Sequence, residues 1–162
     1  MPRRRITSSR LERWLRGEGD LAAALGLTAD DRDELARQAR RRLEAGAVAE
    51  AQRLFGLLAL LGPGSTAARL GQGACHQALG ALEEARAVYD EVLQAEPDNV
   101  HALANRAEVL LLLRRDASAR ADLDAARDRL GPRGGPAALR RRVERLRALA
   151  DAPDPTTTPT GA

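Results

Sequence analysis

The sequence predicts an all-α protein made of helical hairpins that repeat along the chain. Ala, Leu, Arg and Glu dominate the 162 residues, and these residue types have strong helix propensity. Aromatic residues make up 2% of the chain, which argues against a β-sandwich or barrel, because such cores rely on β-branched and aromatic side chains. The third observation is a regular spacing of small, large apolar and turn-forming residues.

Four kinds of residue recur with the spacing that separates Gly46 from Gly80, which is 34 positions. They are a turn glycine (Gly46, Gly80), a small residue (Ala51, Ala85, Ala119), a large apolar residue four positions later (Phe55, Tyr89, Leu123) and an exit proline (Pro63, Pro97). This period and this order are those of the tetratricopeptide repeat. Small residues with the same spacing match the place where the two helices of one repeat approach closely: Ala39, Gly73 and Ala107.

We therefore predict a tetratricopeptide-repeat superhelix of three hairpins, at about 32–65, 66–99 and 100–133. Residues 1–31 are expected to form an N-terminal helical extension. The segment GPRGGP (131–136) precedes a final helix over 137–150, which is expected to cap the stack. Its apolar stripe is Ala138, Leu139, Val143, Leu146 and Leu149. The tail, 151–162, has no apolar periodicity and is expected to be disordered.

Charge and composition exclude several classes of protein. Both ends are rich in Arg, whereas the middle of the chain is mildly acidic, and the net charge is +3. Only Trp14 lies within a basic segment, and single-stranded nucleic acid readers need stacking aromatics, so nucleic acid is not expected as a partner. One Cys excludes an internal disulfide and a Cys-based zinc site. No apolar run is long enough to cross a bilayer, and we expect a soluble cytoplasmic protein.

The sequence contains no recognisable pattern of catalytic residues. Cys75 and His76 are adjacent, and neighbours on a helix point about 100° apart, so they cannot act as a nucleophile and its base. His76 and His101 lie 25 residues apart (101 minus 76), and no third type of metal ligand clusters with them in the sequence. The glycine-rich turns lack the Lys of a phosphate-binding loop. We predict no enzyme activity, no cofactor and no metal.

The first helix of each repeat is expected to line a concave groove. Groove positions in such an array, the second, fifth, ninth and twelfth of each repeat, include Ala36, Arg40, Leu43, Leu70, Ala74, Gln77, His101, Ala104, Glu108 and Leu111. This mixture of small and aliphatic residues suits an extended apolar peptide, with a few hydrogen-bonding groups. A clamp for a C-terminal carboxylate is disfavoured, because Ala36, Gly71 and His101 stand where cationic or amide residues would be needed.

Three segments resemble a known family. LGQGACHQALG (70–80) is similar to the signature L-G-L-G-A-C-R-Q-A-x-G of the class II type III secretion chaperones, the translocator chaperones of the SycD/LcrH type. Residues 107–111, AEVLL, resemble that family's A-E-C-L-L, and residues 16–20, RGEGD, resemble its K-G-G-G-T turn. The resemblance implies a bacterial cytoplasmic chaperone that holds an extended segment of a hydrophobic translocator in its groove and keeps the translocator unaggregated.

The sequence also departs from this family. Groove positions that carry aromatics in the family match Ala36, Arg40 and Leu43 in the first repeat, and Ala68 and Arg69 in the second. The family is usually acidic, whereas this chain is basic at both ends. These differences predict altered anchor pockets, and they suit either a divergent member or a homologue that serves another secreted client.

Family members commonly dimerise through the N-terminal region, and this chain offers a candidate contact there. Leu11, Trp14 and Leu15 form an apolar stripe at helical spacing. They are expected either to meet a second copy or, in the case of Trp14, to pack on the first repeat.

An alternative function is a generic tetratricopeptide scaffold or regulator that joins two proteins. It would use the Arg-rich ends, above all Arg140, Arg141 and Arg142. Replacing that cluster would then remove binding and its salt dependence, while substitutions in the groove would be harmless. The solvated face of a capping helix is the simpler explanation of the same cluster, and it is the one that we favour.

Overall fold

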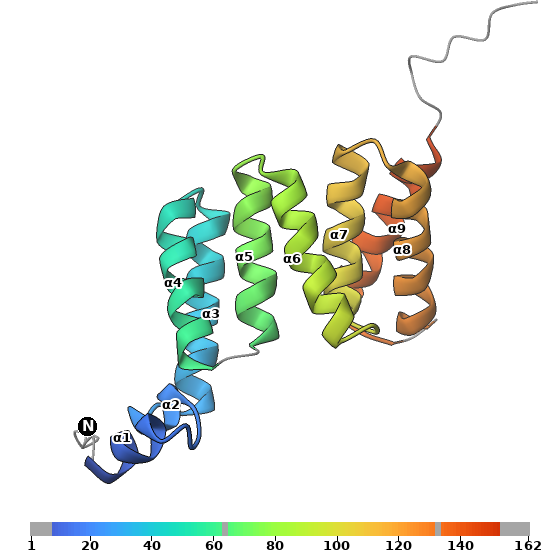
Figure 1. Cartoon of the computed structure of the whole chain (residues 1–162). Coiled ribbons are helices and arrows are strands. Elements are labelled where there is room, and N and C mark those ends of the chain that lie inside the picture. The colour runs from blue at the N-terminus through green and yellow to red at the C-terminus, as the bar shows by residue number, and fades with distance from the viewer. Residues whose placement is uncertain (1–7, 63–64, 132–133, 153–162) are drawn as a thin grey trace, which may run out of the picture. The chain divides into compact units, whose positions relative to one another are not determined.

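The computed structural model describes residues 8–62, 65–131 and 134–152, and these contain nine helices (Figure 1). The all-α prediction is confirmed. The chain divides into two compact units, and the boundary along the sequence falls between Val88 and Tyr89, inside one helix. The predicted disordered tail falls almost entirely on 153–162, outside the described residues. No helix in the described ranges is long and apolar enough to span a membrane.

The N-terminal unit contains the extension, the first hairpin and the start of the second. Its helices are α1 (Ser8–Leu15), α2 (Leu21–Ala24), α3 (Ala29–Glu44), α4 (Val48–Leu61), α5 (Thr66–Ala78) and the first half of α6 (Leu82–Ala95). In this unit α3 packs on α4, and α4 packs on α5. A capping box starts α3, since the Thr28 amide donates to Asp31 Oδ2 at 2.8 Å and the Asp31 amide donates to Thr28 Oγ1 at 3.2 Å.

The core of this unit explains why the second repeat needs a glycine. Phe55 and Ala51 of α4 are buried together with Ala36 and Ala39 of α3. A Cβ atom on Gly71 of α5 would lie 2.1 Å from Cε1 of Phe55. The backbone of α5 therefore rests directly on the Phe55 ring, and a side chain at position 71 is excluded.

The C-terminal unit contains the third hairpin and the final helix. It comprises the rest of α6, α7 (Val100–Leu112), α8 (Asp116–Leu130) and α9 (Ala137–Asp151). Helix α7 packs on α8, and α9 packs on both α8 and α7. The amide of Ala102 donates to Asn99 Oδ1 at 3.0 Å, which caps the start of α7.

The turn between the two helices has the same geometry in all three hairpins, including the third, where Arg114 follows Gly80 by 34 positions (114 minus 80) in place of a glycine. Gly46, Gly80 and Arg114 have φ angles of 77°, 75° and 59°. Gly46 N donates to Leu43 O, and the next amide, Ala47 N, donates to Arg42 O, both at 2.9 Å. The same pair of hydrogen bonds follows Gly80 and Arg114. Each hairpin thus ends its first helix in a Schellman motif.

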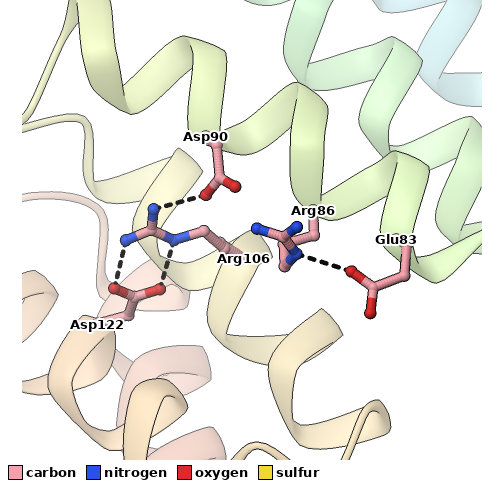
Figure 2. Close-up of polar contacts among 5 residues, drawn as sticks. All are labelled: Glu83, Arg86, Asp90, Arg106 and Asp122. Carbon is pink, nitrogen blue, oxygen red and sulfur yellow. Dashed lines mark hydrogen bonds and ion pairs between the residues drawn. The ribbon is translucent and has the colours of Figure 1, made fainter.

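A partly buried ion cluster ties three helices of the C-terminal unit together (Figure 2). Arg106 of α7 forms a bidentate pair with Asp122 of α8, with Nε–Oδ2 and Nη2–Oδ1 distances of 2.8 and 2.6 Å. Its Nη1 donates to Asp90 Oδ1 of α6 at 2.8 Å. Because Asp122 is 7% exposed, the pair is largely shielded from water. Hydrogen bonds from Arg106 to Asp122, and then to Asp90, raise the pKa of Arg106 above its usual range.

The final helix differs in part from the expected cap. Leu139, Val143 and Leu146 are buried, and Ala150 joins them. Ala138 is exposed, and Leu149 is 59% exposed. The prediction that these two residues belong to the packed face of the capping helix was therefore wrong. The helical spacing was right, but the apolar set is wider than the side of α9 that contacts its neighbours.

Candidate functional site

The first half of the predicted groove holds a cleft of about 480 Å³ between the starts of α3 and α5. Ala36 and Leu58 are its most buried apolar walls, and Ala67 lies at its edge. Polar groups surround it, and Arg32 Nη1 donates to Asp20 Oδ2 at 3.1 Å. The cleft therefore combines a small apolar floor with hydrogen-bonding groups around it.

The six predicted groove residues of the N-terminal unit differ in exposure. Ala36 is buried and Leu43 packs against the core, while Arg40 is exposed. On α5, Leu70, Ala74 and Gln77 are each partly exposed. The accessible surface of these six residues thus consists of one cation, aliphatic groups and one amide.

Neighbouring charges on α3 leave Arg40 as its accessible groove cation. Hydrogen bonds from Arg37, Gln38 and Arg41 lower the pKa of Glu34 to about 2. Arg42 pairs with Glu50 of α4 at 3.2 Å. Within the described residues, Arg40 makes no such pair. Its guanidinium is therefore accessible to solvent.

The second half of the predicted groove lies on α7. His101 is exposed and Leu111 is partly exposed, whereas Ala104 is fully buried. Glu108 is partly exposed, and its Oε2 accepts a hydrogen bond from Arg142 Nη2 of α9 at 2.5 Å. Arg142 Nη1 also donates to Asn105 Oδ1 at 2.8 Å. The negative charge of Glu108 is therefore paired with Arg142 of the same chain.

Arg142 of α9 contacts a predicted groove residue, Glu108, although the sequence assigns it to a basic cluster with Arg140 and Arg141. Yet Arg142 follows Glu108 by 34 positions (142 minus 108), which is the repeat spacing and was available as a signal. In the structure Arg142 reaches α7, while Arg141 is exposed, so these two members of the predicted basic cluster have different surroundings.

No catalytic arrangement is formed around the single cysteine. Cys75 is fully buried in the core of the N-terminal unit, and burial raises the pKa of its thiol. A protonated, enclosed thiol is a poor nucleophile. No group of three or more candidate metal ligands occurs within the ranges that the structure describes.

Helix α1 presents the three residues predicted for dimerisation. Trp14 is 39% exposed and Leu15 is 74% exposed, while Leu11 is partly buried. This helix contacts α2, and it has no fully buried residue of its own. Trp14 therefore keeps much of its surface open within a single chain.

The structure is similar to solved type III secretion chaperones. It matches the translocator chaperone SycD of Yersinia enterocolitica over 82% of this chain and 98% of SycD, with a TM-score of 0.71 and 24% identity. PcrH of Pseudomonas aeruginosa matches over 78% of this chain and 96% of PcrH, with a TM-score of 0.67 and 25% identity. PcrH bound to the chaperone-binding region of PopB matches over 75% and 98% of the two chains, with a TM-score of 0.62 and 27% identity.

Comparison with sequences is less extensive. No protein-family model matches the chain. A curated relative, the CTR9 homolog of Arabidopsis thaliana, is 43% identical over 67 residues, which are 41% of this chain. The match spans only 6% of that relative, so it carries no function across.

These comparisons confirm the tetratricopeptide-repeat fold, and the resemblance read from the three sequence segments agrees with them. The prediction that the chain is not an enzyme also agrees, because the relatives are secretion chaperones. Over most of its length, this chain is structurally similar to translocator chaperones of type III secretion systems.

Proposed function

We propose that this protein is a type III secretion chaperone that binds an extended apolar segment of a translocator on the first helices of its repeats. The observation that carries the proposal is the match to PcrH over nearly all of PcrH, in complexes with the chaperone-binding regions of PopB and PopD. A SycD structure with a peptide of the translocator YopD matches as well. Relatives of this chain thus bind translocator segments.

The chemistry of the groove residues supports the same class of client. Leu70 and Ala74 on α5 offer partly exposed aliphatic surface, and Gln77 offers an amide near them. The cleft beside Ala36 is small and is not lined by aromatic residues. Such a surface suits aliphatic client side chains, with hydrogen bonds that hold the peptide backbone. We infer a cytoplasmic location in a bacterium, because a translocator must be shielded before it is secreted.

The proposal is tested by co-expression with a long protein that carries apolar hairpins and is encoded beside this gene. We expect a soluble complex with the wild-type chain, and loss of co-purification with Leu70→Glu or Ala74→Arg. Both substitutions place a charge among the apolar contacts of the client. Circular dichroism melts of the free variants establish that each variant remains folded.

A matched control is Leu57→Glu on α4, where Leu57 is 43% exposed and lies outside the predicted groove. This variant should bind the client as the wild type does. Unchanged co-purification with both groove variants would rule out the groove assignment. Loss of binding on replacing Arg140, Arg141 and Arg142 together, with the groove variants harmless, would favour the generic scaffold.

A further inference from the structure

Two arginines of helix α9 keep the repeat spacing to predicted groove positions of α7. Arg142 and Arg145 follow Glu108 and Leu111 by 34 positions each (142 minus 108 and 145 minus 111). They therefore occupy the ninth and twelfth positions of a further, incomplete repeat. In a repeat array these positions belong to the face that the first helices share.

The contacts of α9 agree with this register. Arg142 donates to Asn105 Oδ1 and Glu108 Oε2 of α7, so this side of α9 adjoins the groove side of α7. Ala138, Arg142, Arg145 and Leu149 are spaced by four, three and four residues, and they share one face of the helix. Arg147, on the other side of α9, pairs with Asp124 of α8 at 2.9 Å. The pairs of Arg142 with Glu108 and of Arg147 with Asp124 thus fix the orientation of α9 about its own axis.

Two residues of this face remain available after the internal pairs are made. Arg145 is exposed, and it has no hydrogen bond or ion pair within the described residues. Leu149, one turn further, is 59% exposed. On α7, Leu112 is 56% exposed and Leu111 is partly exposed. An accessible guanidinium therefore lies on the same helix face as an uncovered aliphatic side chain.

We propose that α9 is the last client-contacting helix, and that its face selects a client segment in which an Asp or Glu lies next to an aliphatic residue. This inference rests on the proposed chaperone function and extends it to the chemistry of the client. Arg145 would pair with the carboxylate, because a guanidinium binds a carboxylate through paired hydrogen bonds. Leu149 and Leu112 would cover the neighbouring aliphatic side chain.

Glu108 explains why Arg145, and not Arg142, carries this selection. The carboxylate of Glu108 already neutralises Arg142, and a client carboxylate near Arg142 would meet repulsion from Glu108. Among the residues that the structure describes, Arg145 has no ion-pair partner, so it offers an uncompensated positive charge. Charge complementarity of this kind contributes more to selectivity than to total affinity.

The test uses short random peptides displayed on phage and selected on the purified full-length chain. With the wild type, we expect selected peptides to combine aliphatic residues with nearby Asp or Glu. The Arg145→Glu variant should select Lys or Arg at the same place. A labelled acidic peptide from the wild-type selection should bind this variant roughly tenfold more weakly at low salt, as measured by fluorescence anisotropy.

Arg53→Glu is the matched control, because Arg53 is exposed on α4 and makes the same charge change outside this face. It should leave the acidic preference unchanged. The inference is overturned if wild-type peptides are apolar without acidic residues, or if Arg145→Glu keeps the acidic preference. Failure of the chaperone function itself gives a different result: no peptides are enriched, or Leu70→Glu selects the same peptides as the wild type.

Discussion

Gly71 shows how one residue links the sequence motif to the packing of the hairpins. It belongs to the segment that resembles the secretion-chaperone signature, and in the structure it lies against the ring of Phe55. The motif therefore has a structural reason in addition to any role in binding. A side chain at this position would push α5 away from α4 and would change the cleft beside Ala36.

Arg114 carries a backbone strain that the other repeats avoid with glycine. Its φ of 59° lies in the left-handed region, which costs an L-residue about 1–2 kcal/mol. Arg114→Gly removes this strain but adds flexibility to the unfolded chain. We expect the free energy of unfolding to rise by about 0.5–1 kcal/mol relative to Arg114→Ala, measured by urea denaturation.

The alanine variant separates the backbone from the side chain, because both variants lose the contacts of Arg114 and only glycine relieves the strain. Equal stabilities of Arg114→Gly and Arg114→Ala would contradict the strain argument. The proposed groove residues lie on α3, α5 and α7, and Arg114 follows the end of α7, so both variants should retain client binding.

At the scale of elements, the Arg106 cluster holds α7 to α8 and to the end of α6. Arg106→Met would leave Asp122 buried without its partner, and breaking a buried pair in this way costs about 3–5 kcal/mol. We expect a loss of this size in the free energy of unfolding, measured by urea denaturation. Asp90→Asn should cost less, because Asp90 is more exposed than Asp122.

A double variant, Arg106→Met with Asp122→Leu, tests whether the loss comes from the uncompensated charge. It should recover part of the stability, since no buried charge then remains at Asp122. A double variant no more stable than Arg106→Met alone would show that packing, and not charge, dominates at this site.

At the scale of the whole molecule, we predict a homodimer through α1. Solved structures of SycD include an alternative dimer, and in this chain Trp14 and Leu15 are exposed on α1. Leu15→Glu should shift the protein to a monomer in light scattering at high concentration, because a charge would enter the apolar contact. Leu60→Glu on α4 is the control, as Leu60 is similarly exposed at 68%.

A wild-type chain that is monomeric at high concentration would contradict this prediction. A dimer that survives Leu15→Glu but is lost with Leu60→Glu would move the interface from α1 to α4. The groove residues are separate from both helices, so the oligomeric state and client binding are measured independently.

The sequence by itself determined the helical class, the period and the turns, because these depend on local propensity and on spacing along the chain. Gly46, Gly80 and Arg114 all adopt the predicted turn, including the position where the glycine is absent. The register of the repeat also predicted which residues would line the groove.

Only the tertiary structure decided which of those positions are accessible and which charges remain uncompensated. Ala104 is fully buried, and Arg142 is committed to Glu108, whereas Arg145 and Leu149 stay open to solvent. Spacing places a side chain on a helix face, but exposure and pairing depend on neighbouring helices. The carboxylate that neutralises Arg142 comes from α7, a helix that lies 34 residues earlier in the chain and reaches α9 only through packing.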